Sequence, residues 1–324
     1  INTILTPRAQ MNPRYYNWLF HTEQFADEFY KWGHGIVADL WTTRWQEMKR
    51  ISIIVPSDAE QQSIADFLDK KCSEIDEMIS LQEIISDELK KYKQSVITEA
   101  VCKGLSHDVP MRDSGVQWVG QIPEGWKVSR VGLHFSIILG KMLCDTPIEG
   151  GDLVPYFCAA NVHFDGIATE ELKRMWFSKE EQDKYRVQVG DLLVVEGGAG
   201  AGGCTIVQNL SNGTFIQNSI MIVRSDSQDC RFLKYYLELL VKQGYVDFVC
   251  NKATIPHFTK DKLSQVPYAF PSRKEQKAIA DYLDSKCCQI DTLIAVRQSK
   301  IKALQEYKKS IIYEYVTGKK SVNA

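Results

Sequence analysis

The sequence predicts an α+β protein in which mixed α/β domains are joined by two long helices that form an antiparallel coiled coil. Two observations lead to this prediction: a long stretch that occurs twice, and a series of short strand-like segments between the two copies. The chain has 324 residues, 44% hydrophobic and 10% aromatic, which is an ordinary globular composition. A disordered or collagen-like chain is therefore excluded.

The repeat is the strongest feature of the sequence. Residues 56–101 match residues 271–316 without gaps, at an offset of 215 residues, and 21 of the 46 positions are identical. Each copy opens with Pro-Ser-x-x-Glu, where the serine and the glutamate are typical of a capping box at the start of a helix. Each copy is followed by a glycine that can end a helix, Gly104 or Gly318. We therefore expect two helices of about 45 residues each.

Apolar residues recur in both copies at alternating steps of four and three, which is the pattern of a coiled-coil seam. The predicted seam includes Met78 and Tyr92 in the first copy, and Leu293 and Tyr307 in the second. Its principal members are Ile64, Leu68, Ile75, Leu89, Ile279, Leu283, Ile290 and Leu304. A helix of this length needs a partner, and the expected partner is its own duplicate, paired antiparallel about a local two-fold axis. The alternative is that the two helices pack on separate globular cores.

The segment between the repeats is predicted to form one complete mixed α/β domain, residues 105–270, with a helix near 231–244. Its strand-like runs are 154–159, 190–195, 205–207, 215–223 and 266–270. Residues 1–55 resemble only the last third of that domain, with 14–20 parallel to 234–240, and the front of this first domain is absent from the sequence. The predicted order is a remnant domain (1–55), a helix (56–104), a complete domain (105–270), a second helix (271–318) and a tail (319–324).

The sequence shows no constellation of residues typical of catalysis, metal binding or nucleotide binding. The nine cysteines lack zinc spacing and the six histidines occur singly, so reduced thiols in a cytoplasmic protein are expected. The glycine-rich segment 190–203 lacks the Gly-Lys-Ser/Thr of a phosphate loop. We expect either a tight turn there or a backbone surface that approaches another molecule closely. No signal peptide is recognised, and no apolar stretch is long enough to cross a membrane. We expect no cofactor in this chain.

A polar and basic segment, residues 251–260, lies just before the last strand of the complete domain. Its lysine, threonine and histidine side chains are of types that contact nucleic-acid phosphates. The candidate DNA-binding residues, including a counterpart in the remnant domain and one early loop lysine, are Lys141, Lys252, Thr254, His257, Lys260 and Arg44. The formal net charge is −2, so any nucleic-acid surface must be local. The alternative for each residue is a plain surface loop.

The repeated motif Pro-Ser-x-x-Glu-Gln-x-x-Ile-Ala-x-Phe/Tyr-Leu-Asp resembles the conserved helices of the specificity subunit of Type I restriction-modification enzymes. The segment 113–126 is similar to the opening segment of a target recognition domain in that family. Segments 190–195 and 217–223 resemble internal strands of such a domain. The resemblance covers essentially the whole chain, and the departure is the truncated first recognition domain.

The resemblance implies a non-catalytic DNA-recognition subunit of a restriction and methylation enzyme. Such a subunit is expected to recognise a half-site of a bipartite target in double-stranded DNA, and its paired helices to set the half-site spacing and to dock modification (methyltransferase) subunits. S-adenosylmethionine and ATP are expected on partner subunits, and a restriction subunit to join through the complex. Self-association of two chains is a further option, and no membrane partner is expected. The alternatives are a coiled-coil structural or partner-binding protein that does not recognise DNA, and a nucleotide-binding enzyme.

Overall fold

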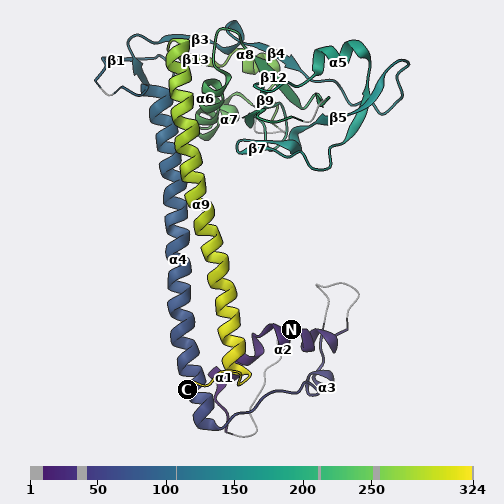
Figure 1. The fold of residues 1–324 in the computed structure, drawn as a ribbon, viewed down its shortest axis with the longest axis vertical. Coiled ribbons are helices and arrows are strands. Elements are labelled where there is room, and N and C mark those ends of the chain that lie inside the picture. Colours follow the sequence, from purple (N-terminus) through teal and green to yellow (C-terminus); the bar gives the residue numbers. More distant parts are fainter. Residues whose placement is uncertain (1–9, 35–41, 107, 211–212, 251–255, 323–324) are drawn as a thin grey trace. The chain divides into compact units, whose positions relative to one another are not determined.

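The computed structural model describes residues 10–34, 42–106, 108–210, 213–250 and 256–322. The chain divides into two compact units, the first made of Ile1–Lys90 with Asp291–Ala324, and the second of Lys91–Ile290. The two long helices are α4 (Asp58–Lys103) and α9 (Arg273–Val316) (Figure 1). One part of each helix belongs to the first unit and the other part to the second. The division by compactness thus cuts through both helices, and the predicted domain boundaries stay a prediction.

The first unit is helical in its described residues. Its short helices are α1 (Pro13–Phe20), α2 (Glu23–Lys31) and α3 (Trp45–Met48). Helix α1 begins after Asn12, whose side chain accepts hydrogen bonds from the first free backbone N–H groups, and Pro13 occupies the first turn. The core joins α1 to both long helices, because Tyr15 packs in one cluster with Leu68 of α4 and Val316 of α9.

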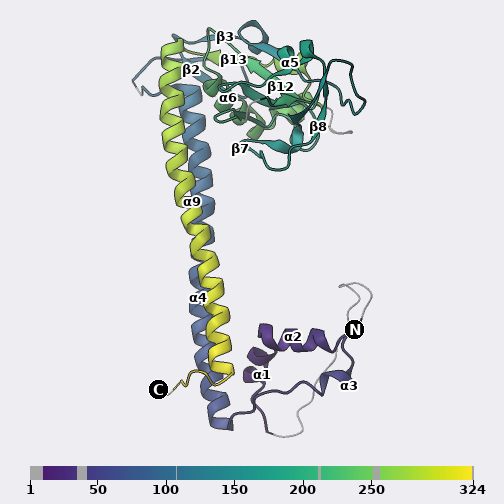
Figure 2. The same cartoon turned by 45° about the vertical axis from the view of Figure 1, so that its right-hand side comes forward.

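Within the first unit α4 and α9 pair antiparallel, so the predicted coiled coil is confirmed. The Lys308 ammonium lies 2.6 Å from the Asp76 carboxylate, and the Arg297 guanidinium donates to the Gln82 side chain at 3.1 Å. Gln82 and Arg297 are equivalent positions of the repeat, 215 residues apart. A contact between equivalent positions lies on the local two-fold axis that relates the two helices. In both views α4 and α9 lie side by side within each unit (Figure 2).

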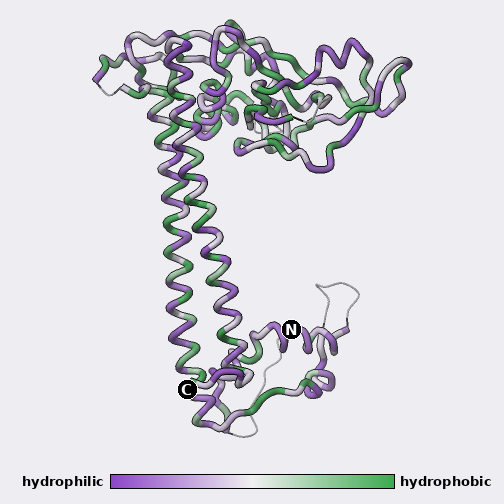
Figure 3. The backbone as a smooth tube through the Cα atoms, in the orientation of Figure 1, coloured by the Kyte–Doolittle hydropathy of each residue, from purple (hydrophilic) through white to green (hydrophobic). Residues whose placement is uncertain are grey.

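The phase of the seam differs from the prediction at one of the two alternating heptad positions. Met78, Tyr92, Leu293 and Tyr307 are 43–55% exposed, so their expected place in the seam is wrong. The buried positions of α4 that follow the heptad are Gln61, Ala65, Leu68, Cys72, Ile75, Gln82 and Ser86. From Leu68 the seam can be continued in two phases, and both contain apolar residues. Hydrophobic and hydrophilic residues alternate along both long helices (Figure 3). The facing helix selects the phase, because only one of the two sets can point at it.

The second unit holds the mixed α/β part of the chain. Its central sheet has the order β10-β9-β12-β4 and is antiparallel throughout. A three-stranded sheet has the order β11-β5-β8, and the remaining strands pair as β1-β2, β3-β13 and β6-β7. The strands are β1 (Met111–Asp113), β2 (Gln121–Pro123), β3 (Lys127–Arg130), β4 (Ser136–Leu139), β5 (Asp152–Phe157), β6 (Val162–His163), β7 (Gly166–Ile167), β8 (Arg174–Phe177), β9 (Leu192–Val195), β10 (Cys204–Ile206), β11 (Phe215–Ile216), β12 (Ile220–Arg224) and β13 (Pro267–Phe270).

The central sheet is buried on both faces. Leu192 and Val194 of β9 belong to the large core that also contains α6, whereas Leu193 and Val195 belong to a second core on the opposite face. This alternation follows from the two-residue period of a strand. The helices of the unit are α5 (Lys179–Tyr185), α6 (Cys230–Lys242), α7 (Tyr245–Val249) and α8 (Lys260–Ser264).

One predicted strand, 215–223, is two strands in the structure. β11 pairs with β5 and β12 pairs with β9 and β4, so the segment crosses from one sheet to another. Gln217 interrupts the run, and the backbone N–H of Ile220 donates to its carbonyl at 2.9 Å. Gln217, Asn218 and Ser219 separate the two strands, and the prediction joined the apolar runs on either side of them into one.

The ends of the long helices agree only partly with the expected capping. Gly104 follows α4 with φ +75°, and Gly318 follows α9 with φ +72°, as expected of terminating glycines. At the start of α9 the Ser272 hydroxyl accepts from the Glu275 N–H at 3.4 Å. The Glu275 carboxylate, however, accepts from the Trp126 indole at 3.2 Å. This carboxylate thus connects the helix to Trp126 of the second unit, whereas the capping box predicts a bond to the start of the helix itself.

Candidate nucleic-acid interface

Several loops meet at one end of the central sheet, where β4 and β9 end and β12 begins. Gly140 N–H donates to the Ile220 carbonyl at 3.0 Å, and Glu196 N–H donates to the Ser219 carbonyl at 2.8 Å. The antiparallel pairing of β12 with both neighbours places all three chain segments at this end. We call the residues Gly140, Lys141, Glu196–Gly198, Gln217–Ser219 and His257 the loop edge.

The structure places His257 at the loop edge. Its backbone pairs with Gly197, and its imidazole Nδ1 lies 3.3 Å from the Glu196 carboxylate while 58% of the side chain is exposed. The next residue, Phe258, is buried and donates its N–H to the Glu196 carbonyl at 2.6 Å. Lys260 is exposed in the first turn of α8. This short segment therefore presents the His257 imidazole beside the glycine-rich turn and, three residues further on, the exposed Lys260 side chain.

Lys141 lies at the loop edge, but its ammonium group points into the domain. The side chain is 11% exposed, and the ammonium is 2.5 Å from the Glu181 carboxylate. It also donates to the Trp176 carbonyl at 2.9 Å and lies 5.2 Å from the centre of the Phe177 ring. Partial burial acts to raise the pKa of Glu181, but hydrogen bonds from Lys141 and Ser178 outweigh it and lower the pKa. Lys141 thus connects the end of β4 to β8 and α5, which is a structural role. DNA binding by Lys141 stays a prediction.

The other predicted residues lie elsewhere or are not described. Lys252 and Thr254 lie outside the described residues. Arg44 is an exposed residue at the start of α3 in the first unit. The structure thus brings His257 and the backbone of Lys141 to one edge of the sheet. DNA binding by each of these residues stays a prediction.

Sequence reasoning missed two amide side chains at the loop edge, Gln217 and Asn218. Both are half-buried, and the Gln217 amide donates to the Asn218 side chain at 2.5 Å. The Ser219 hydroxyl donates to Gln217 Oε1, also at 2.5 Å, which leaves the amide groups in a fixed orientation. Asparagine and glutamine are the side chains that pair bidentately with adenine. The Gln-Asn-Ser sequence between two apolar runs was the signal that could have found them.

The glycine-rich segment forms a tight turn, as predicted. Gly202 has φ +82°, and a Cβ at this position would lie 2.7 Å from Val246 and 2.9 Å from Val241. The turn is thus held between the end of β9 and the helices α6 and α7. Within the residues that the structure describes, no group of three or more His, Cys, Asp or Glu side chains could hold a metal ion. The described part of the chain also contains no helix long and apolar enough to cross a membrane.

Comparison with known proteins identifies the family. The model of the Type I restriction modification DNA specificity domain matches residues 123–306, which is more than half of the chain. The chain therefore belongs to the family of Type I specificity proteins.

Named relatives agree with this assignment. The chain is 26% identical over 201 residues to the Type I restriction enzyme MjaVIII specificity subunit of Methanocaldococcus jannaschii, covering 61% of this chain and 43% of the relative. The StySPI specificity subunit of Salmonella potsdam is 23% identical over 250 residues, covering 75% of this chain and 52% of the relative. A relative named after the MjaX enzyme of M. jannaschii is 25% identical over 286 residues, 84% of this chain and 60% of the relative. The chain thus spans about half the length of these relatives.

Solved structures share the fold. A chain from a study of the assembly and conformational transition of the Type I restriction-modification system matches with a TM-score of 0.71 and 18% identity. That match covers 94% of this chain and 70% of the other. The HsdS subunit from Thermoanaerobacter tengcongensis matches with a TM-score of 0.54 and 18% identity, over 95% of this chain and 71% of the other. The long helices and the mixed domain are therefore the fold of such subunits.

Proposed function

We propose that this chain is the DNA sequence-specificity subunit of a Type I restriction-modification system. In this role it recognises one half-site of a bipartite target with the recognition domain in the second unit, and it catalyses no reaction itself. The observation that carries the proposal is the family match over residues 123–306, which covers most of that domain and most of α9. The named relatives are specificity subunits, in agreement with a non-catalytic role.

The loop edge supports DNA recognition within this proposal. His257 of the loop edge, and Lys260 three residues further along the chain, carry groups that suit phosphate contacts, which fix the position of a protein on the duplex. Gln217 and Asn218 offer amide groups that suit contacts to base edges, which specify sequence. A near-neutral chain can present such a local surface if partner subunits supply further positive charge.

Exposed apolar residues on the long helices support the docking of methyltransferase subunits. Met78, Leu81 and Ile84 of α4 are 43%, 53% and 57% exposed, and the three-residue spacing places them along one side of the helix. Leu293 and Val296 of α9, the repeat equivalents of Met78 and Leu81, are 47% and 55% exposed. Clustered apolar side chains on a helix surface are typical of a protein–protein contact. All five residues belong to the first unit.

The remaining elements of the proposal concern the complex. S-adenosylmethionine and ATP would bind partner subunits and not this chain, and a restriction subunit would join through them. The assembly would act in the cytoplasm. Self-association of two chains is a further arrangement of the same recognition parts.

The decisive experiment is co-expression of the chain with its cognate methyltransferase subunit, followed by sequencing of the methylome. The proposal predicts adenine methylation at one defined sequence. The double variant Q217A/N218A should abolish or change that motif, while E180A, an exposed surface substitution on α5, should leave it unchanged. If the wild-type chain binds the methyltransferase but no motif is methylated, the chain is a partner-binding coiled coil and the proposal is wrong.

A further inference from the structure

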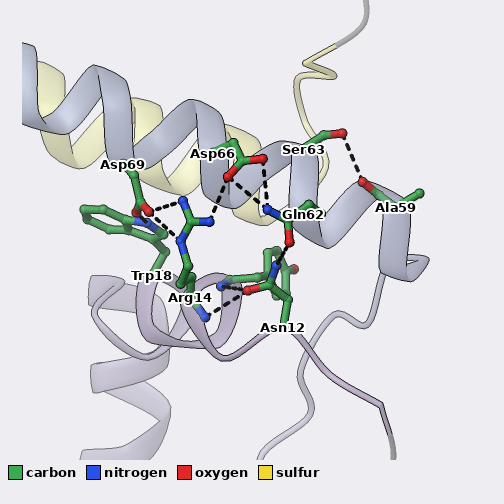
Figure 4. Close-up of polar contacts among 9 residues, drawn as sticks. Asn12, Arg14, Trp18, Ala59, Gln62, Ser63, Asp66 and Asp69 are labelled. Atoms are coloured by element: carbon green, nitrogen blue, oxygen red, sulfur yellow. Dashed lines mark hydrogen bonds and ion pairs between the residues drawn. The ribbon is translucent and has the colours of Figure 1, made fainter.

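Helix α1 is held on α4 by a set of polar contacts that surrounds one arginine (Figure 4). The Arg14 guanidinium donates to Asp66 at 2.7 Å and to Asp69 at 2.6 Å, and the Trp18 indole donates to Asp69 at 2.7 Å. At the start of α1, the Asn12 N–H donates to the Gln61 side chain at 3.0 Å. Gln61 in turn donates to the Pro56 carbonyl at 2.9 Å.

Helix α6 is held on α9 by the same set of contacts. The Arg231 guanidinium donates to Asp281 at 2.7 Å and to Asp284 at 2.8 Å, and the Tyr235 hydroxyl donates to Asp284 at 2.8 Å. The Asp229 N–H donates to the Gln276 side chain at 3.0 Å. Gln276 donates to the Pro271 carbonyl, also at 3.0 Å. We call each set a latch.

The two latches are equivalent position by position. On the long helices the offset is 215 residues, since Gln61, Asp66 and Asp69 correspond to Gln276, Asp281 and Asp284. On the short helices the offset is 217, since Arg14 corresponds to Arg231. The expected parallel between residues 14–20 and 234–240 is therefore wrong by three residues. Two adjacent tyrosines in each segment suggested it, and the contacts on the long helices decide against it.

Stability alone does not explain this agreement. Arg14, Asp66 and Asp69 are 40–56% exposed, and ion pairs in contact with water contribute little to stability. An arginine that contacts two carboxylates one turn apart, together with a glutamine that accepts from the helix start, instead fixes how a helix is rotated and shifted along its partner. Apolar contacts lack this directional requirement.

The second latch is connected to the loop edge through the core. Helix α6 packs on β10 and β9, and its Leu233 and Tyr236 share a core cluster with Leu192 and Val194 of β9. Strand β9 ends at Val195, directly before Glu196 of the loop edge. The orientation of α6 on α9 therefore determines the orientation of the loop edge relative to α9 within the second unit.

We propose that the Arg231 latch is a positioning device that sets the angle at which the recognition domain is carried on α9. Arg231, Asp281, Asp284 and Gln276 are positioning residues that need not touch DNA. The equivalent latch on α4, with Arg14, holds the recognition-type helix of the first unit in the same way. The functional consequence of this inference rests on the proposed function, whereas its geometric content does not.

The test uses the full chain. Spin labels are attached to unnatural amino acids that replace two exposed residues, Asp183 of α5 and Lys274 of α9. The distance distribution between the labels is measured for the wild type and for R231A, R231K and D284N. The matched control is K277A, which removes an ion pair to the same Asp281 carboxylate without contacting α6. We expect a broadened distribution in R231A and D284N, an intermediate one in R231K because lysine lacks the planar fork, and the wild-type distribution in K277A.

The second readout is the affinity of the assembled methyltransferase for DNA that contains the target motif found in the methylome. R231A should raise the Kd for the motif about tenfold and leave the Kd for unrelated DNA unchanged, with K277A as wild type. R231K and D284N keep the test valid if R231A does not fold. Distance distributions as narrow as that of the wild type in both R231A and D284N would overturn the inference. If no DNA motif is methylated with the wild-type chain, the proposed function alone is refuted, because the distance measurement still tests the latch.

Discussion

Helices α1 and α6 occupy equivalent places on the long helices, and they differ in how much apolar surface supports them. α1 buries three aromatic or aliphatic residues among its eight, whereas α6 buries seven among its thirteen. The arginine of the first latch is 46% exposed and that of the second is 30% exposed. Both helices nevertheless make the same directional contacts. The comparison teaches that the polar contacts select the register, and the apolar area decides how firmly the helix is held.

The largest expected effect comes from the apolar side of this comparison. Leu68 and Leu283 are equivalent in the repeat, and both are fully buried. Truncation to alanine should cost about 2–5 kcal/mol of unfolding free energy in each case. Hydrogen exchange measured by mass spectrometry should become faster in peptides of the second unit in L283A, and in peptides of the first unit in L68A. Identical exchange patterns in the two variants would contradict the assignment of the helix halves to separate cores.

An effect of similar size is expected where α6 meets the glycine turn. G202A forces alanine into φ +82° and places its Cβ against Val241 and Val246. The left-handed backbone costs about 1–2 kcal/mol, and the overpacking adds about 1–3 kcal/mol. G198A, at φ +88° but with open space around the Cβ, is the matched control and should show only the backbone cost. Equal losses in urea denaturation would show that α6 can move away from the turn.

The latch arginines should contribute less to stability than the core. R231A is expected to lower the unfolding free energy by about 1–2 kcal/mol, because a partly buried arginine leaves three carboxylates without their shared partner. R14A should lower it less, because that arginine is more exposed. Thermal unfolding monitored by circular dichroism measures both. A larger loss for R14A would mean that α1 depends on its latch more than on Tyr15 and Leu19.

The smallest effect is the acid dependence of the two latches. Hydrogen bonds from Gln62 and Arg14 lower the pKa of Asp66, and those from Lys277 and Arg231 lower the pKa of Asp281. A lowered carboxyl pKa contributes stability that is complete above the unfolded pKa of about 3.9 and is lost as the pH falls through the folded pKa. Melting temperatures should thus fall below about pH 4, and less steeply in D66N/D281N. Parallel pH curves for wild type and variant would exclude a contribution from these carboxyls.

Several elements could be predicted from the sequence because their cause is local. The helix ends at Gly104 and Gly318 follow from glycine's access to positive φ, and the turn at 190–203 follows from its glycines. The loop edge could not be predicted, because it depends on which strands are neighbours. β11 and β12 are adjacent in the sequence and belong to different sheets, so Gln217 and Asn218 come to lie beside Glu196 only after the sheets form.

The sequence by itself determined that two long helices are duplicates, that each needs a facing helix, and that the chain belongs with Type I specificity proteins. These properties are periodic or local, so the order of the residues alone is enough to recognise them. Only the tertiary structure decided the phase of the seam, the burial of the Lys141 ammonium and the correspondence of Arg14 with Arg231. Each of these depends on which of several chemically similar side chains faces a partner distant in the sequence, and packing geometry selects among them.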